Sequence, residues 1–327
     1  PAGLDRIFYA LEVFSENLEE KLAPFLDELM KRLLPMMSVS NDGSTTSIHV
    51  RELAISGVGS AANAVGSKIL PYFDTVMTNL KHYLSLDYQE EENQLLLTQS
   101  MDTLGAMARA IGGQDVQGNP AILASLTFSP AVLAEECCKL ALDLVTNYDD
   151  PDIRKCAYGL FGSVAYVAKA EMAAVLPTII ARIRESVTSK EGISLEYKEE
   201  EIKALGGALA LDELNGDDEE DEEDFVSLEN GQRVKADEDD ADLDGVDAIR
   251  VENAFMQEKE QALLSLKDIC RYVGPAAYSP YLNQSILEAW NLLEYPDEDV
   301  RKAAVQAVGV FMMAYYKLAI SGAGFAA

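Results

Sequence analysis

The chain has 327 residues, of which 48% are hydrophobic, and a formal net charge of −30. This length and apolar content can bury a large core. The negative charge argues against direct binding of nucleic acid or anionic membranes and favours basic proteins as partners. Four cysteines, none in CxxC spacing, predict reduced core thiols rather than a disulfide framework: Cys137, Cys138, Cys156 and Cys270.

Two helical patterns alternate along the chain. The first is an apolar helix introduced by a proline, as in "LAPFLDELMKRLLPMM" from Leu22. Proline is tolerated near a first helical turn because that N–H has no partner within the helix. The second pattern, as in "VRELAISGVGSAANAVG", places an arginine eight residues before a glycine, and it occurs at Arg51 and Gly59, Arg154 and Gly162, and Arg301 and Gly309. Such a glycine lets a neighbouring helix approach closely.

One copy of each pattern forms a predicted helical hairpin of about 40 to 50 residues. A second helix without a partner (Leu4–Leu18) comes first, and five hairpins follow. Their first helices begin near Leu22, Ile69, Ser129, Glu171 and Tyr278, and their second helices near Ser47, Glu91, Pro151, Val251 and Asp297. We therefore predict an all-α fold, one α-solenoid (superhelix) of HEAT type over residues 1–327. First helices form its outer face and second helices its concave face.

Glycines and two interruptions complete this plan. Gly66, Gly112 and Gly274 stand where second helices should end, in the position that favours a left-handed residue. Residues 114–127 read as a loop between repeats. Residues 190–250 lie inside the fourth hairpin, between its two helices, and are acid-rich; we predict that this insertion is largely disordered, because like charges repel and little apolar surface can be buried.

The insertion contains an unbroken acidic run, and two interpretations of it stay open. As a simple solubility device, it would keep an apolar solenoid from associating. As a tethered polyanion, it would raise the local concentration of carboxylates beside the concave face and attract a basic partner. The run consists of Asp217, Asp218, Glu219, Glu220, Asp221, Glu222, Glu223 and Asp224.

Polar residues on the second helices are candidates for binding a basic partner. Carboxylates spaced along a groove suit lysine ammonium groups, and an asparagine side chain can hold the backbone of an extended peptide. For each residue alone, a solvated helix face or a pair within the helix is the competing interpretation, so we consider them as a set. The candidates are Glu12, Glu16, Glu52, Asn63, Asp102, Glu252, Asn253, Glu258 and Glu260.

The repeated arginines have a structural interpretation instead. We expect Arg51, Arg154 and Arg301 to pair with aspartates in the turns and so to form a ladder between repeats. The expected partners are Asp150 or Asp152 and Asp297 or Asp299.

Nothing in the sequence favours enzyme chemistry or a cofactor. The two histidines, His49 and His82, are on different hairpins and have no cysteine or paired carboxylate at a ligand spacing. No phosphate-binding glycine loop is present, and the acidic run lacks the spaced ligands and the glycine of an EF-hand. No apolar run reaches the ~20 residues of a membrane span.

Several segments together resemble one family. The runs "LPYFDTVMTNLKHYL", "SMDTLGAMARAIGG", "LAEECCKLALDL" and "VENAFMQEKEQALLSLKDI", with the acidic run before the last, are similar to the middle of importin-β (karyopherin-β) nuclear transport receptors. The resemblance covers essentially the whole chain. It implies a receptor that shuttles between cytoplasm and nucleus, passes the pore through nucleoporins and releases import cargo on binding Ran-GTP.

The resemblance also implies partners. One branch of the family is associated with histones H3 and H4 and with ribosomal proteins, which are basic. The chain begins at Pro1 without methionine, and we expect it to be a fragment that lacks the N-terminal repeats with most of the Ran contact. It would then hold part of the cargo surface and at most a secondary Ran contact.

Two other interpretations stay open at this point. A HEAT array can also be a structural scaffold of the phosphatase-regulatory or condensin type, which docks folded partners through hydrophobic ridges. Histone chaperoning without transport would use the same contacts as import. Recovery of histones and ribosomal proteins, rather than phosphatase or chromosome-structural subunits, from nuclear extract would favour the receptor.

Overall fold

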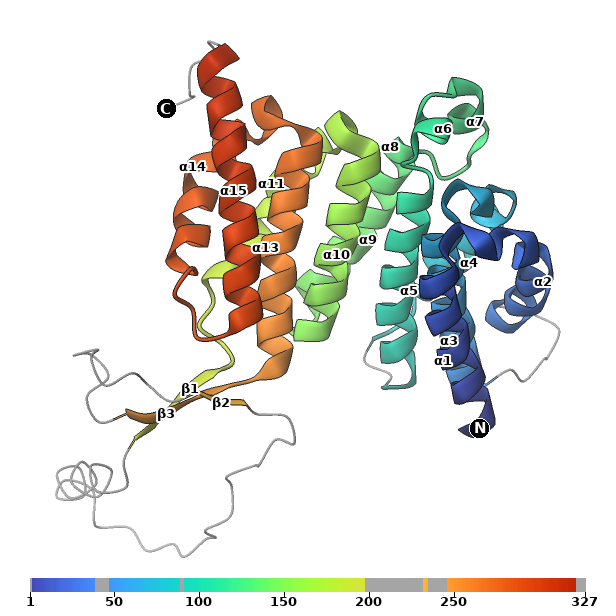
Figure 1. Cartoon of the computed structure of the whole chain (residues 1–327), viewed down its shortest axis with the longest axis horizontal. Helices are drawn as coiled ribbons and strands as arrows, with labels where there is room; N and C mark the ends of the chain where they lie inside the picture. The colour runs from blue at the N-terminus through green and yellow to red at the C-terminus, as the bar shows by residue number, and fades with distance from the viewer. Residues whose placement is uncertain (1, 39–46, 89–90, 198–231, 235–245, 322–327) are drawn as a thin grey trace, which may run out of the picture.

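The computed structural model describes residues 2–38, 47–88, 91–197, 232–234 and 246–321 (Figure 1). It opens with helix α1 (Ala2–Leu18), and five helical hairpins follow. These are α2 (Leu26–Met37) with α3 (Ile48–Val65), α4 (Phe73–Tyr83) with α5 (Glu91–Ala110), α8 to α9 (Pro130–Asn147) with α10 (Pro151–Ala168), α11 (Leu176–Thr188) with α13 (Asn253–Val273), and α14 (Pro275–Asn291) with α15 (Glu298–Ser321). The predicted order of hairpins is confirmed.

Short elements connect these helices. Three 3₁₀ segments precede first helices: η1 (Glu19–Phe25), η2 (Gly66–Tyr72) and η4 (Lys169–Ala174). The first helix of the third hairpin is divided by a π-helical segment, η3 (Leu133–Cys137), between α8 (Pro130–Val132) and α9 (Cys138–Asn147). The predicted loop at 114–127 contains two short helices, α6 (Gln114–Gln117) and α7 (Pro120–Ser125).

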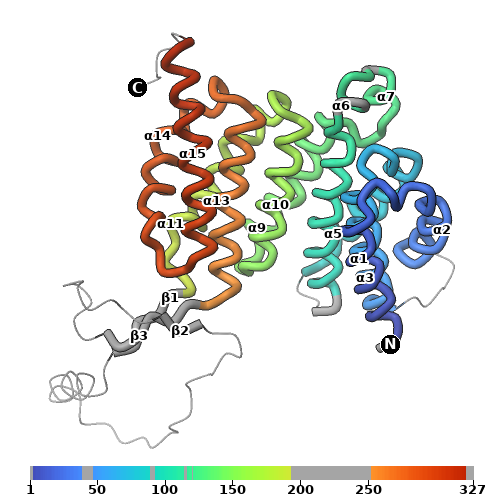
Figure 2. Tube along the Cα trace, in the orientation of Figure 1, coloured from blue at the N-terminus to red at the C-terminus, as the bar shows by residue number. Residues whose placement is uncertain are grey.

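The second helices stack side by side along the molecule. Each packs on the next in the order α1, α3, α5, α10, α13 and α15, and the first helices cover one side of this row (Figure 2). One connected set of buried apolar side chains runs from Phe8 to Leu318. Because a HEAT hairpin cannot bury its apolar face alone, this stacking of neighbours forms the core.

The insertion differs from the prediction in part. Strand β1 (Ile193–Tyr197) pairs antiparallel with β3 (Val246–Val251), which also pairs antiparallel with β2 (Gln232–Val234). Disorder is therefore wrong for these three strands, while residues 198–231 and 235–245 lie outside the described part. Because α11 and α13 hold the two ends of the insertion side by side, the residues next to those ends can form a ladder.

Two of the three glycines expected to end second helices do so with positive φ. Gly66 has φ +57° and Gly274 has φ +96°. Gly112 does not adopt this conformation. A Cβ there would lie 2.1 Å from Cε1 of Tyr166, so Gly112 instead makes room for the aromatic ring of the next second helix.

Lys169 adopts the same backbone conformation as Gly66 without being glycine. Its φ and ψ are +48° and −118°, against +57° and −131° at Gly66. This conformation strains a residue with a Cβ. Replacing exposed Lys169 with glycine is expected to raise the free energy of unfolding by about 1 kcal/mol, measured by urea denaturation. Lys169→Ala, which keeps the Cβ, should not, and equal gains in both variants would contradict the explanation.

The glycines eight residues after the repeated arginines differ in how closely neighbouring atoms approach them. A Cβ at Gly59 would lie 2.8 Å from Oγ1 of Thr103, the hydroxyl that donates to the carbonyl of Ile55 at 3.0 Å. A Cβ at Gly162 would make only ordinary contacts at 3.7 Å, and one at Gly309 would meet nothing within 4 Å. The predicted close approach of helices is therefore found at Gly59 alone.

This contrast gives a matched pair of variants. Gly59→Ala is expected to destabilise the protein by about 1–3 kcal/mol, because the Thr103 hydroxyl must move out of its hydrogen bond. Gly309→Ala, with open space around it, is expected to stabilise by roughly 0.5–1 kcal/mol through helix propensity. Thermal unfolding of both variants checks the prediction, and equal changes in stability at the two positions would contradict it.

The predicted ladder of arginines and turn aspartates is wrong in its partners. Arg154 donates from Nε to Oε1 of Glu258 at 2.8 Å and also pairs with Asp149. Asp150 is occupied as the N-cap of α10, because its side chain accepts from two backbone N–H groups. Because the carboxylate of an N-cap residue accepts from the first N–H groups of its helix, Asp150 is not available to Arg154, which pairs with other carboxylates.

The other two arginines also depart from the prediction. Arg301 donates to the carbonyl oxygens of Tyr295 and Pro296 at 2.6 and 2.7 Å, and Asp297 caps α15. Nε of Arg51 is buried with no hydrogen-bond partner among the described residues. A different arginine, Arg184, links successive first helices through a bidentate pair with Glu288.

By length and hydropathy alone, α15 could cross a membrane. The helices Pro151–Ala174 and Leu176–Thr188 meet the same length and hydropathy criteria only if the bent pair is counted as one span. We expected no such run. Core helices of water-soluble proteins share these properties, and α15 packs on α13 and α14. Helix length and composition therefore give little support to a membrane span here.

Candidate functional site

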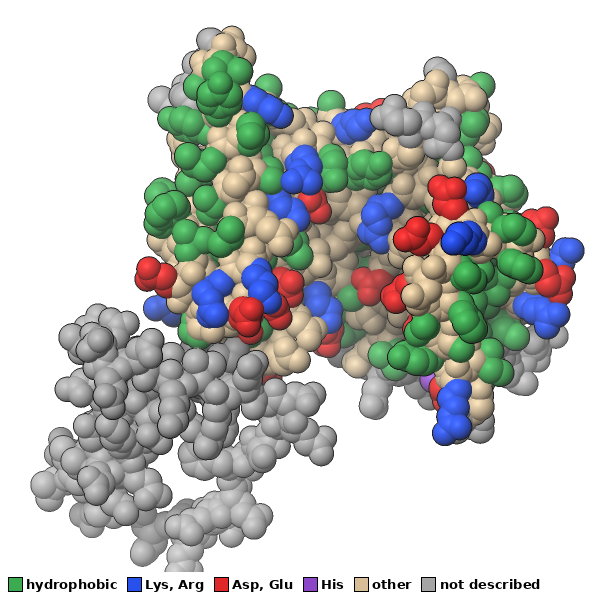
Figure 3. Space-filling model, viewed as in Figure 1, with side chains coloured by type: hydrophobic (Ala, Val, Ile, Leu, Met, Phe, Trp, Pro, Cys, Tyr) green, Lys and Arg blue, Asp and Glu red, His purple; other side chains and the backbone are tan. Residues whose placement is uncertain are grey.

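The concave face carries an open groove between neighbouring second helices. It has a volume of about 590 Å³ and is lined from α3, α5, α10 and α13. Figure 3 shows this face hollowed near its centre. Glycines on three of these helices, Gly59, Gly105 and Gly162, lie in its lining. Small residues leave backbone accessible, so an extended peptide could approach the floor of the groove closely.

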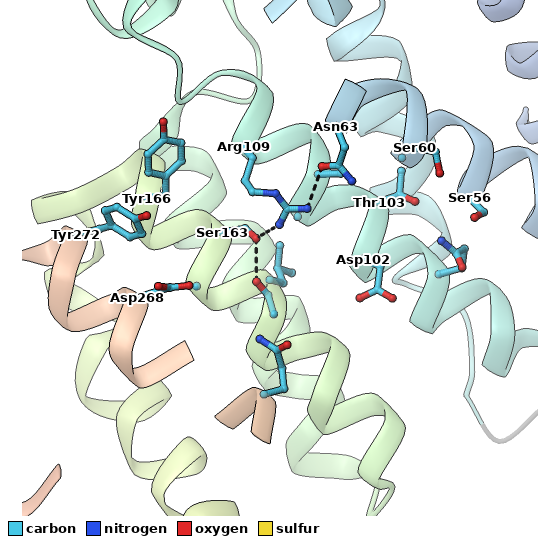
Figure 4. A pocket seen from close by; sticks show the side chains of 18 residues that line it. Ser56, Ser60, Asn63, Asp102, Thr103, Arg109, Ser163, Tyr166, Asp268 and Tyr272 are labelled. Atoms are coloured by element: carbon cyan, nitrogen blue, oxygen red, sulfur yellow. Dashed lines mark hydrogen bonds between the residues drawn. The ribbon is translucent and has the colours of Figure 1, made fainter. Parts of the chain in front are cut away.

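Arg109 lies at the centre of the groove and connects three second helices (Figure 4). Its Nη2 donates to Oδ1 of Asn63 on α3 at 3.1 Å, and its Nη1 donates to Oγ of Ser163 on α10 at 2.5 Å. Both acceptors are neutral. Desolvation lowers the pKa of Arg109, and the nearby charges of Asp102 and Asp268 oppose this. An arginine held by neutral acceptors keeps its charge available to a ligand.

Two carboxylates flank Arg109. Asp102 reaches solvent, but the groove wall desolvates it and raises its pKa, and a hydrogen bond from Cys156 opposes the rise. Desolvation also raises the pKa of Asp268, against the opposing charges of Lys267 and Arg271. A carboxylate that has lost solvation gains more from a cationic ligand than a fully hydrated one does. Both aspartates are therefore suited to hold basic side chains, and Asp268 already has the ammonium of Lys267 at 3.6 Å.

The predicted site residues on α1, α3 and α5 lie in different settings. Glu12 accepts from Oγ of Ser56, Glu16 is exposed, and Glu52 contacts Nδ1 of His49 at 3.3 Å. Asn63 and Asp102 line the groove itself. The structure thus brings Asn63 and Asp102 together, and leaves Glu12, Glu16 and Glu52 outside the groove lining.

The predicted site residues on α13 also lie in different settings. Glu252 and Asn253 are exposed at the start of the helix, where the backbone N–H of Glu252 donates to the carbonyl of Gly192 at 2.8 Å. Glu260 is half-buried, and desolvation together with Asp299 and Asp297 raises its pKa. None of these three lines the groove.

Glu258 requires a correction. It is only 3% exposed and is engaged by Arg154 across the α10–α13 interface. A buried, paired carboxylate offers no surface to a partner, so its position in α13 makes it a structural residue. The acidic run from Asp217 to Asp224 lies outside the described residues.

Sequence reasoning missed Arg109, Asp268 and Tyr272, which also line the groove. Arg109 is seven residues after Asp102, and therefore on the same face of its helix. Asp268 has the same relation to Gln261, another lining residue. Extending that seven-residue spacing from Asp102 would have found Arg109. The choice of carboxylates alone as candidates excluded it.

The fold and the groove define the class as an α-solenoid of HEAT repeats with a polar concave face. No family model matches the chain. It is 34% identical to importin-4 of Mus musculus over 94% of its own length and 29% of that protein's, and 34% identical to importin-4 of Homo sapiens over 83% and 22%. A probable importin subunit beta-4 of Schizosaccharomyces pombe is 27% identical.

Solved structures agree on the fold. The chain superposes on Kap121p bound to Pho4p with a TM-score of 0.65 and 17% identity, covering 96% of this chain and 25% of the other. Kap121p bound to Nup53p gives a TM-score of 0.64. The chain belongs to the importin-β (karyopherin-β) family, and it spans about a quarter of the length of the relatives it matches.

Proposed function

We propose that this chain is the cargo-binding part of a nuclear import receptor rather than an enzyme, and that it binds basic segments of cargo proteins on its concave face. The observation that carries the proposal is the 34% identity to importin-4 over 94% of the chain. The groove supports it through its form, because small residues, amide side chains and two desolvated aspartates line the same face.

The charge of the chain supports basic cargo. A net charge of −30 draws lysine- and arginine-rich proteins toward the surface from a distance. We propose histones H3 and H4 and ribosomal proteins as the cargo class. In the longer receptor, Ran-GTP would release the cargo and nucleoporins would carry the receptor between cytoplasm and nucleus. A related structure, Kap121p bound to Nup53p, supports the nucleoporin contact.

A binding measurement tests the proposal. A lysine-rich histone H3 tail peptide is expected to bind this chain at about 50 mM salt with a micromolar or lower Kd. Binding should weaken steeply as salt rises, because salt shortens the Debye length and screens the attraction between exposed charges. Asp102→Asn should weaken binding, whereas Arg32→Gln, on the exposed face of α2, should not. Absence of binding at low salt would remove the proposal.

The acidic run is a separate part of the proposal. Deletion of residues 212–247 distinguishes two forms of it in the same peptide assay. If the carboxylates recruit cargo, deletion should weaken binding. If the run occupies the groove in place of cargo, deletion should strengthen peptide binding. An unchanged Kd would leave solubility as the function of the run.

A further inference from the structure

An arginine lies at the centre of the groove, although the chain as a whole is strongly acidic. Arg109 is exposed there, and its two hydrogen bonds go to Asn63 and Ser163, which are neutral. Among the described residues, no carboxylate forms an ion pair with it. A groove that selected only cations would not hold a guanidinium without a direct carboxylate partner at its middle, since a lysine placed beside it would be repelled.

From this arrangement we infer that Arg109 determines specificity in the groove, by binding a carboxylate side chain of the cargo peptide between two basic residues held by Asp102 and Asp268. The inference rests on the proposed function and deepens it. The ligand is a basic segment interrupted by one acidic residue, rather than an unbroken run of lysines.

Guanidinium chemistry supports this assignment. The side chain has five N–H groups, and its two hydrogen bonds to Asn63 and Ser163 use one on each terminal nitrogen. The remaining N–H groups can donate to an incoming carboxylate. Because Asn63 on α3 and Ser163 on α10 hold the guanidinium from both sides, its orientation is fixed before the ligand arrives.

The flanking aspartates explain why the carboxylate must come with cations. A lone anion at Arg109 would be repelled by Asp102 and Asp268, whose charges already act on the arginine. Lysines on either side of the anion reverse this repulsion and replace the solvation that both aspartates have lost. The favoured ligand therefore has alternating charge.

Helix geometry sets an approximate spacing for the ligand. Asp102 and Arg109 are seven residues apart on α5, which is about 10 Å along the helix axis. An extended peptide covers that distance in about three residues. Because alternate side chains of an extended peptide share a face, lysines two residues before and two residues after a central aspartate point the same way as it does. The long lysine side chain covers the remaining distance to Asp102.

Two peptides that differ only at the centre test the inference, with aspartate in one and lysine in the other, each flanked by lysines two residues away. Wild type is expected to bind the aspartate peptide about tenfold more tightly, the ratio of one charge-assisted contact. Arg109→Gln should remove this preference or reverse it, and Arg109→Lys should keep only part of it. Arg32→Gln serves as a matched control and should leave the preference unchanged.

The outcomes separate the inference from the proposed function. If both peptides bind wild type equally, or if Arg109→Gln keeps the preference, the inference is wrong while basic-cargo binding stands. If neither peptide binds at about 50 mM salt, both are wrong. The comparison of two peptides on wild type remains decisive even if a variant unfolds, and thermal unfolding of each variant establishes which of them can be used.

Discussion

Replacing Glu258 with alanine is expected to lower the free energy of unfolding by about 3 kcal/mol. The side chain of Glu258 is 4% exposed and that of Arg154 is 13% exposed. Their pair is hence largely withdrawn from water. Desolvation by itself would lower the pKa of Arg154, but the hydrogen bond and charge of Glu258 outweigh it and raise that pKa. Without Glu258, a mostly buried guanidinium retains only partners near the surface, Asp149 and Glu191.

The double variant separates the value of the pair from the cost of leaving one charge alone. Arg154→Met combined with Glu258→Leu is expected to recover most of the loss, because replacing a buried pair by apolar residues is often close to neutral. Urea denaturation of both single variants and the double variant gives the coupling energy. Strictly additive effects, or a loss below about 1 kcal/mol for Glu258→Ala, would show that the pair contributes little.

Alkaline pH is expected to destabilise the protein from about pH 9 upward. All four cysteines are free and buried. Burial raises the pKa of Cys137 and of Cys270 to about 12, against an ordinary value of 9, and raises the pKa values of Cys138 and Cys156 further. Unfolding exposes thiols that ionise readily, so it releases protons in this pH range.

The sign follows from the raised pKa values. The stability that the protonated thiols contribute is complete below pH 9, and it is lost as pH rises from 9 toward 12. Each thiol loses about 1.4 kcal/mol per pH unit in that interval, so four of them remove roughly 5 kcal/mol per unit. Lys259, whose pKa burial lowers to about 8, acts in the opposite direction, but it is one group against four.

Tm measured from pH 7 to pH 11 under reducing conditions checks this expectation. Cys270→Ala should reduce the loss of stability above pH 9 by about 1.4 kcal/mol per pH unit, whatever it does to stability at pH 7. Oxidation must be prevented, because it would also unfold the protein around buried thiols. A Tm that stays level through pH 10, or an unchanged slope in Cys270→Ala, would contradict the explanation.

The insertion is held at its root by buried polar contacts. Lys259 is 2% exposed, and its ammonium donates to the carbonyl oxygens of Ser186, Val187 and Ser189 at 2.7 to 3.0 Å. These carbonyls end α11, where no further helical N–H can satisfy them. Lys259 thereby fixes α11 against α13 at the point where the chain leaves the solenoid and returns.

Local patterns were enough to place the helices. Prolines near first turns, N-cap aspartates such as Asp150 and the constant interval from Arg154 to Gly162 depend on residues a few positions apart. Each acts within one helix or turn, so the sequence alone revealed the five hairpins and their order. Part of the candidate groove could be predicted in the same way, because Asn63 and Asp102 lie on polar faces of second helices.

Contacts between distant residues were decided only by tertiary packing. Arg154 pairs with Glu258, 104 positions away, as well as with Asp149, because Asp150 caps α10 and Asp152 pairs with Lys155. Gly112 makes room for a tyrosine ring of the next repeat rather than adopting the left-handed conformation. The ends of the insertion formed strands because two helices brought them together. Sequence spacing fixes which side of a helix a residue occupies, but the partner it meets there depends on how neighbouring helices stack.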